Sequence, residues 1–202
     1  GKTTLINVIS GHFPLTSGTI AVDGVQIGHL PAHEIAGRGV ARTYQIPRPF
    51  ANMTVLDNVT LAATFGGPAR PAAEMRDEAV HWIGFTGLAG KEAALPAELN
   101  LHERKFLELA RALAARPKLL LLDEVLSGLN PAEIDNAIRL VRAIRAQGAT
   151  IVFVEHLMRA VVELSDRVAV LNEGKLFALG APRDVMRDPR VISIYLGKAY
   201  AA

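Results

Sequence analysis

Residues 119–124 read Leu119-Leu120-Leu121-Leu122-Asp123-Glu124, four leucines followed directly by two acidic residues. A short, purely apolar run is typical of a strand that is buried on both faces of a parallel sheet. In open α/β sheets, ligands bind at the carboxyl ends of the strands. This stretch therefore predicts a buried strand that delivers Asp123 and Glu124 to a ligand site at the edge of a sheet.

A second apolar run, TIVFV at residues 150–154, predicts another buried parallel strand. Between the two runs, residues 132–147 carry apolar side chains at helical spacing and are followed by Gly148, a common helix stop. Strand, helix and strand in this order predict a right-handed crossover unit. His156 comes directly after the second strand and Glu155, so it is expected at the same edge as the acidic pair.

The first four residues, Gly1-Lys2-Thr3-Thr4, have the composition of a phosphate site. A helix start offers free amide donors and a partial positive charge, Lys2 adds a full charge, and Thr3 can hold Mg²⁺. Alone, the four residues are equally an ordinary helix start, and the acidic pair is equally a solvated strand end. Because phosphoryl transfer needs both halves of a metal site, the two features together predict binding of MgATP.

Composition sets limits on the function. The chain has 202 residues, of which 50% are hydrophobic, and a formal net charge of +2. So small a positive excess does not indicate a nucleic-acid partner. No cysteine is present, which excludes disulfides and thiolate chemistry. No apolar run approaches the roughly 18–20 residues that a membrane span requires.

The rest of the pattern places a helical segment inside a sheet protein. Residues 54–115 are largely helical in pattern and predict a separate lobe. Residues 18–24 and 39–45 each read as a short strand, and residues 167–179 predict a hairpin around a central Asn-Glu-Gly-Lys turn.

Five motifs, in a fixed order, resemble a known family. They are GKTT, a glutamine in a loop (Gln45), LELARALAARPKLLLLDE at residues 107–124, SGLNP at residues 127–131, and Glu155-His156. Over essentially its whole length the chain resembles the nucleotide-binding subunit of an ATP-binding cassette (ABC) transporter. The resemblance implies an ATPase that uses ATP and Mg²⁺.

The implied fold is the α/β fold of P-loop NTPases, a mostly parallel sheet flanked by helices with an inserted helical lobe. Residues 1–53 and 116–202 would form a RecA-like nucleotide-binding core. Residues 54–115 would form the helical signature subdomain.

The resemblance also assigns roles at the phosphate and metal sites. Gly1, Lys2, Thr3 and Thr4 resemble the end of the Walker A loop, which binds the phosphates, with Thr3 also a ligand of Mg²⁺. Asp123 resembles the Walker B aspartate, a second ligand of that Mg²⁺.

Further roles concern catalysis. Glu124 resembles the catalytic glutamate that orients the attacking water, and His156 the switch histidine. Gln45 resembles the Q-loop glutamine, which senses Mg²⁺ and water and is therefore expected to act both in metal binding and in catalysis. Residues 127–130 resemble the D-loop, in which Asn130 is expected to contact nucleotide.

The family signature, usually L-S-G-G-Q, falls here on residues 99–103, which read L-N-L-H-E. Asn100 is a good N-cap and Glu103 completes a capping box, so a helix is expected to start here, with a buried face made of Phe106, Leu107, Ala110 and Leu113. In one reading, Asn100 and Glu103 only cap that helix. In the other, Asn100, His102 and backbone amides bind phosphate on a partner cassette, although Glu103 would repel it unless neutralised or turned away.

Details of the sequence favour one subfamily. Residues 128–131, Glu155-His156 and the tail GAPRDVMRDPRVISIYLG at residues 180–197 resemble importers of branched-chain amino acids and related amides. This resemblance implies a second cassette, identical or not, transmembrane permease subunits, and a periplasmic binding protein, with no nucleic acid. The subunit is then expected at the cytoplasmic face of the membrane. Residues 42–45 favour the type that carries a glycine-rich insertion after the Q-loop.

The family loop reads G-x-x-G-x-G-K-[ST]-T, in which Gly1 is only the last glycine. We therefore expect the preceding strand and glycines to lie upstream of this chain, and the chain by itself to be inactive. Two alternatives remain at this point. One is a soluble ABC-type ATPase of DNA repair or translation, and the other is a regulatory, non-catalytic cassette suggested by the altered signature.

Overall fold

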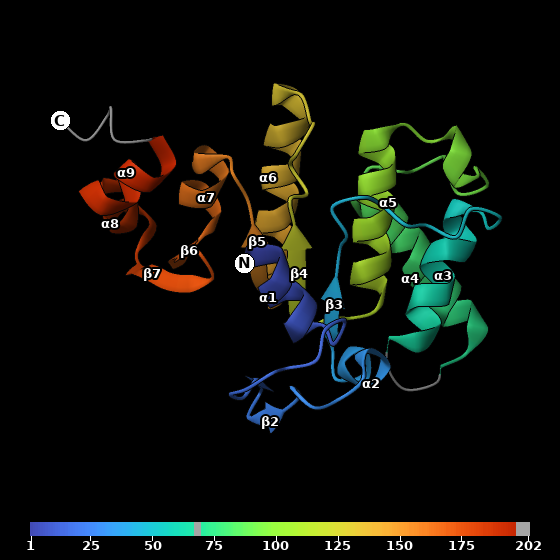
Figure 1. Cartoon of the computed structure of the whole chain (residues 1–202). Helices are drawn as coiled ribbons and strands as arrows, with labels where there is room; N and C mark the ends of the chain where they lie inside the picture. The colour runs from blue at the N-terminus through green and yellow to red at the C-terminus, as the bar shows by residue number, and fades with distance from the viewer. Residues whose placement is uncertain (67–69, 197–202) are drawn as a thin grey trace.

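The computed structural model describes residues 1–66 and 70–196, and it is centred on a small parallel sheet (Figure 1). The sheet has the order β3-β4-β5, with β3 at Val40–Arg42, β4 at Leu119–Asp123 and β5 at Thr150–Val154. Both neighbours run parallel to β4, and Leu120 lies opposite Ala41 and Ile151. The α/β fold with a parallel sheet is thus confirmed.

The central strand β4 is buried on both faces. Leu120, Leu121 and Leu122 are each no more than 1% exposed. Leu120 and Leu122 belong to a large apolar core shared with helices α5 (Leu101–Ala114) and α6 (Pro131–Ala146). Leu121 points to the opposite face, into a smaller core that it shares with Ile6, Ile27, Ile35 and Val40. This alternation explains why the leucine run of the strand has no polar position.

Helix α6 connects β4 to β5 and completes the predicted crossover. It begins at Asn130, whose side chain accepts a hydrogen bond from the Glu133 amide, while the Glu133 carboxylate accepts one from the Asn130 amide. This capping box satisfies donors that a helix start leaves free. The helix follows the predicted range of residues 132–147 within one residue at each end.

The prediction of a fully buried strand at residues 150–154 is wrong in part. Val152 is 38% exposed, and every position of β5 is either exposed or half-buried. The reason is its place in the sheet, because among the described residues β5 pairs with β4 alone. A groove with a volume of about 760 Å³ borders β5 and separates it from the C-terminal segment, with a lining that includes Lys2, Leu5, Val152, Val168, Leu176 and Leu179.

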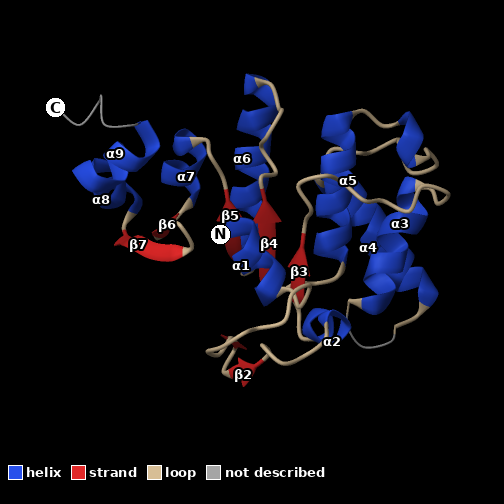
Figure 2. Ribbon diagram, in the orientation of Figure 1, coloured by secondary structure: helices blue, strands red, loops and turns tan. Residues whose placement is uncertain are grey.

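The helices of residues 54–115 lie together on one side of the sheet (Figure 2). They are α3 (Val55–Phe65), α4 (Ala72–Phe85), the short 3₁₀ helix η1 (Pro96–Glu98) and α5. The predicted face of α5 is buried, with Phe106, Leu107, Ala110 and Leu113 at most 4% exposed. The apolar core of these helices continues into β4 and α6. The division into two subdomains stays a prediction.

The N-terminal segments cover the other face of the sheet. Helix α1 (Lys2–Ile9) packs beside β4, and a hairpin of β1 (Ala21–Val22) and β2 (Val25–Gln26) leads to α2 (Ala32–Gly37). The strand predicted at residues 18–24 is therefore only two residues long.

The predicted C-terminal hairpin is confirmed as antiparallel β6 (Val168–Asn172) and β7 (Lys175–Gly180). Helix α8 (Pro182–Arg187) packs against β7 and contacts both α7 (Met158–Leu164) and α9 (Pro189–Leu196). No described helix is long and apolar enough to cross a membrane.

One buried polar residue ties the loop after β3 to α3. The Asn58 side chain is fully buried, accepts a hydrogen bond from the Phe50 amide at 2.8 Å, and reaches the carbonyls of Phe50, Met53 and Thr54 at 3.0–3.1 Å. The amide oxygen satisfies the Phe50 N–H, and its two N–H donors are shared among the three carbonyls, so this side chain replaces water for the buried loop backbone.

We expect Asn58→Ala to lower the free energy of unfolding by about 1–3 kcal/mol, because it leaves buried backbone groups without partners. The measurement is urea denaturation of the intact protein. Asn52→Ala, at an exposed position of the same loop, is the matched control and should change stability by less than about 0.5 kcal/mol. If the two changes lowered stability equally, the hydrogen bonds of Asn58 to the loop after β3 would not contribute to stability.

Candidate nucleotide site

Glu124 is the centre of the candidate site. Its Oε2 accepts a hydrogen bond from Gln45 Nε2 at 2.5 Å, and its Oε1 lies 2.6 Å from His156 Nε2. Because an ionised carboxylate can only accept, the His156 ring is a donor at Nε2. The three residues follow β3, β4 and β5 respectively, so the carboxyl ends of three parallel strands meet at this carboxylate. The structure thus brings together the three residues expected to act in catalysis.

Asp123 precedes Glu124 and is buried, with 2% of its surface exposed. Burial raises the pKa of its carboxyl group, while nearby Arg42 and Lys2 oppose that rise and Glu124 adds to it. Its Oδ1 is buried without a hydrogen-bond partner among the described residues. A buried carboxylate oxygen without a partner is costly, and a hard cation is the ligand that would satisfy it.

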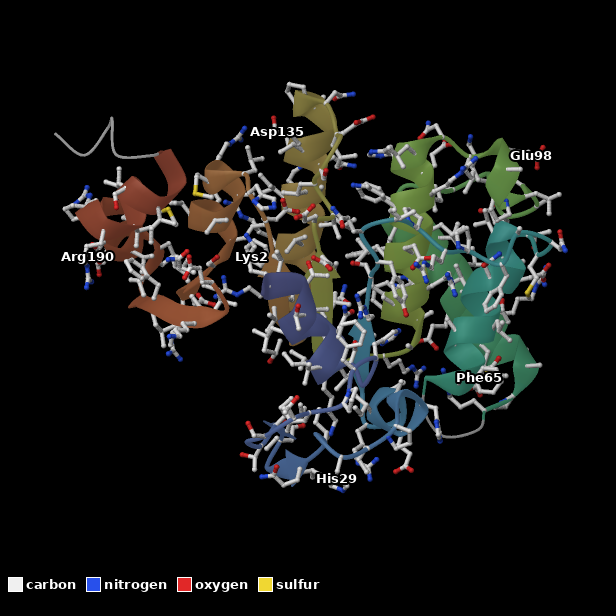
Figure 3. All side chains as sticks on the ribbon, in the orientation of Figure 1. Lys2, His29, Phe65, Glu98, Asp135 and Arg190 are labelled. Atoms are coloured by element: carbon white, nitrogen blue, oxygen red, sulfur yellow. The ribbon has the colours of Figure 1, made fainter. Side chains whose placement is uncertain are left out.

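The first turn of α1 lies at the same edge. Gly1 is its N-cap, and no side chain of the described residues caps its free amides. Figure 3 shows Lys2 at the end of α1 that lies nearest the ends of β4 and β5. Lys2 is partly buried and acts on the pKa of Asp123, whereas Thr3 and Thr4 are exposed. A free helix start, an ammonium group and an unsatisfied carboxylate therefore share one corner of the molecule.

The other predicted nucleotide contacts form a second group. Asn100 and Asn130 cap α5 and α6, their Oδ1 atoms accepting from backbone amides at 2.9 Å and 3.0 Å. His102 stacks on Phe106 with 4.3 Å between ring centroids, and its Nδ1 lies 3.7 Å from the carboxylate of Glu133. These side chains contact the helix starts and not the Glu124 cluster, and their role in binding nucleotide stays a prediction.

The negative charge of Glu103, the acidic residue of the altered signature, is paired with a positive charge. Glu103 Oε1 lies 2.8 Å from Lys91 Nζ, and Oε2 accepts from the Asn100 amide at 2.9 Å. The hydrogen bond from Lys91 is the main cause that holds the pKa of Glu103 below its usual value. Repulsion of phosphate by Glu103 is therefore reduced, and this weakens the objection to phosphate binding at this helix start.

The loop after Gln45 is fastened to α5. Glu108 is buried and accepts hydrogen bonds from the Arg48 amide at 2.9 Å and from Arg111 at 2.6 Å. Arg111 also donates to the Arg48 carbonyl and lies over the Phe50 ring, 4.9 Å from its centroid. The loop still presents apolar surface, since Ile46 is 74% and Phe50 47% exposed.

Two charged residues behind Glu124, the buried Lys105 and the half-buried Glu155, were not among the predicted site residues. Lys105 donates to backbone carbonyls just after β4, and Glu155 accepts a hydrogen bond from the Leu126 amide at 2.9 Å. The signal for Lys105 was present, because it falls on the apolar stripe of α5 with Leu109 and Leu113. Glu155 carried no comparable signal.

The chain matches a known protein family over more than half of its length. Residues 1–127 match the ABC transporter family, and residues 175–201 match a family described as branched-chain amino acid ATP-binding cassette transporter. The chain is 36% identical to the high-affinity branched-chain amino acid transport ATP-binding protein BraF of Pseudomonas aeruginosa. It is 35% identical to the corresponding protein LivG of Escherichia coli. Each alignment covers 98% of this chain and 84% of the relative.

Solved structures are similar over nearly the whole chain. An ATP-binding cassette of an ABC transporter in its ADP conformation superposes with a TM-score of 0.86 at 29% identity, covering 98% of this chain and 84% of that one. A nucleotide-free ATP-binding cassette gives 0.83 at 27% identity, with the same coverage. Both the sequence relatives and the fold lead to one conclusion: the chain belongs to the ABC transporter family, as one of its ATP-binding cassettes.

Proposed function

We propose that this chain is the ATP-hydrolysing subunit of an importer for branched-chain amino acids or related amides. The observation that carries the proposal is the Glu124 carboxylate, held on both oxygens by Gln45 and His156 at the edge where α1 begins. The solute class is supported by the similarity to BraF and LivG and by the match of residues 175–201.

The site fits in-line attack of water on the terminal phosphate. Lys2 and the free amides of α1 would bind the phosphates, because a helix start attracts anions. Glu124 would orient the attacking water and accept its proton. Each carboxylate oxygen has a second lone pair, so Glu124 can bind this water while Gln45 and His156 keep its orientation. The complete cluster also argues against a non-catalytic, regulatory cassette.

The residues present fit a magnesium ion. Asp123 offers an unsatisfied carboxylate oxygen, and Thr3 an exposed hydroxyl in the first turn of α1. Mg²⁺ commonly takes only one or two carboxylates and completes its shell with water and substrate phosphates. Thr3, Asp123 and Gln45 would hold the ion, which when bound would neutralise charge on the phosphates.

The proposed subunit works in an assembly. Asn100, His102 and Asn130 lie at the starts of α5 and α6, and we assign them to the ATP bound by a second cassette. The exposed Ile46 and Phe50 would contact a permease subunit, which would hold the ATPase at the cytoplasmic face of the membrane. A periplasmic binding protein would supply the solute. Within the chain, residues 1–53 and 116–202 would act as the nucleotide-binding core and residues 54–115 as the signature subdomain.

We expect Glu124→Gln to lower kcat for ATP hydrolysis by about 10²–10⁴-fold, because an amide cannot accept the proton of the water. The KM for ATP should change little. The assay uses the intact protein assembled with its partners. Glu74→Gln, at an exposed position on α4, is the matched control and should leave kcat unchanged. A Glu124→Gln assembly that turns over at the wild-type rate would exclude Glu124 as the base.

We expect Asp123→Asn to raise the melting temperature of the nucleotide-free protein at pH 7–8. Burial raises the pKa of Asp123 above its unfolded value, so the ionised form destabilises the fold. This penalty is absent below the unfolded pKa, about 3.9, and grows as the pH rises through the folded pKa. The amide removes it, so the difference between variant and wild type should shrink in acid.

The same variant tests the metal site. Wild-type protein should gain about 2.7 kcal/mol at 100 times the Kd of MgATP. Mg²⁺ should increase the stabilisation by ATP much less in Asp123→Asn than in the wild type. An unchanged Mg²⁺ dependence, measured by thermal unfolding with ATP in the presence and absence of Mg²⁺, would contradict the assignment of Asp123.

A further inference from the structure

We propose that Lys105 is a positioning residue that holds the backbone of the turn carrying Glu124. The inference rests on the proposed function and names a residue outside the family motifs quoted above. The turn consists of residues 124–127, directly after β4. Lys105 lies on α5, and its Nζ contacts the carbonyl oxygens of Glu124 at 3.3 Å, of Val125 at 3.5 Å and of Ser127 through a short hydrogen bond.

A lysine in this place is unusual because it is buried, with 9% of its surface exposed. An ammonium group removed from water is costly unless all its donors are satisfied. Lys105 has three donors, and three carbonyls of one turn surround them. Burial lowers the pKa of Lys105, while the charges of Glu155 and Glu124 act in the opposite sense.

A second, half-buried charge holds the amide side of the same turn. Glu155 Oε1 accepts a hydrogen bond from the Leu126 amide at 2.9 Å. Burial raises the pKa of Glu155, and the charge of Lys105 opposes that rise. Donor and acceptor groups of residues 124–127 are thus held by two charged side chains from different elements, α5 and the segment after β5.

The turn needs such support at its first residue. Glu124 has φ 51°, in the left-handed region that residues with a Cβ avoid. Its amide donates to the Val154 carbonyl at 3.0 Å, and its carbonyl accepts from Ser127 at 3.2 Å. The backbone of Glu124 sets the direction of its carboxylate. Gln45 and the 58% exposed His156 hold that carboxylate from the solvent side, whereas Lys105 holds the backbone from the buried side.

The alternative is that Lys105 has a purely structural role, and the experiment must distinguish this role from positioning of Glu124. Lys105 lies on the buried stripe of α5, where methionine has a similar length and packs well. If Lys105 only fills space, Lys105→Met should be tolerated. If it positions Glu124, the same change should impair the chemical step and leave ATP binding intact, because Lys2 and the α1 amides do not depend on it.

The test is steady-state ATP hydrolysis by the intact protein in its assembly. We expect Lys105→Met to lower kcat roughly 10–100-fold, as expected for a displaced catalytic group, with the KM for ATP changed less than about twofold. Lys105→Arg keeps the charge and several donors and should recover most of the rate. Lys118→Met, at an exposed lysine, is the control and should behave as wild type.

A double-mutant cycle with Glu124→Gln sharpens the test. If Lys105 acts through Glu124, Lys105→Met should cause little further loss in the Glu124→Gln background, measured under single-turnover conditions. Circular dichroism verifies folding of each variant. If Lys105→Met does not fold, Lys105→Gln replaces it. Glutamine has no charge and a shorter side chain than lysine, so kcat should again fall while the KM for ATP changes little.

An unchanged kcat in Lys105→Met or Lys105→Gln, or fully additive losses in the cycle, would overturn this inference. Failure of the proposed function looks different: the wild-type assembly would not hydrolyse ATP, or Glu124→Gln would match its rate. A wild type that hydrolyses ATP, a Glu124→Gln variant that does not, and an active Lys105→Met variant would overturn the role of Lys105 alone.

Discussion

The burial of β4 on both faces is the constraint on which the rest of the structure depends. Leu120 and Leu122 belong to the large core shared with α5 and α6, and Leu121 belongs to the small core shared with α1 and α2. Two layers of helices must therefore meet around one short strand. Asp123 and Glu124, which follow the last leucine, are consequently placed where the start of α1, the turn before α6 and the loop after β3 come together.

Asp123 and Glu124 differ in how well their carboxylates are hydrogen-bonded. Glu124 is held by Gln45 and His156 at its carboxylate and by Lys105 at its backbone. Asp123 is buried, and its Oδ1 has no hydrogen-bond partner among the described residues. Such an arrangement costs stability in the free protein and is typical of a site that is completed by its ligand. A metal-assisted hydrolysis requires both a fixed general base, here the Glu124 carboxylate, and a free metal ligand, here Asp123 Oδ1.

Much of this could be predicted from the sequence because the signals were local. A run of four leucines, a helical period over residues 132–147 and the capping pattern at Asn100 each depend on neighbours in the chain. The incomplete burial of β5 could not be predicted, since exposure depends on which strands pair beside it. The partners of Lys105 and Glu155 were missed for the same reason, because they lie about 20 and 30 residues away in the sequence and meet them only in the folded chain. The burial of Lys105 itself was indicated by its place on the apolar stripe of α5.

Lys2, Asp123 and Glu124 are thus proposed to act on one nucleotide. The most direct measurement is an experimental structure of the intact protein in its assembly with Mg²⁺, ADP and a phosphate transition-state mimic. We expect Lys2 on the mimic, the metal beside Asp123, and a water at hydrogen-bond distance, about 2.6–3.2 Å, from the Glu124 carboxylate. A nucleotide bound with Lys2 and the acidic pair on different ligands, or with Glu124 turned away from the water, would contradict it.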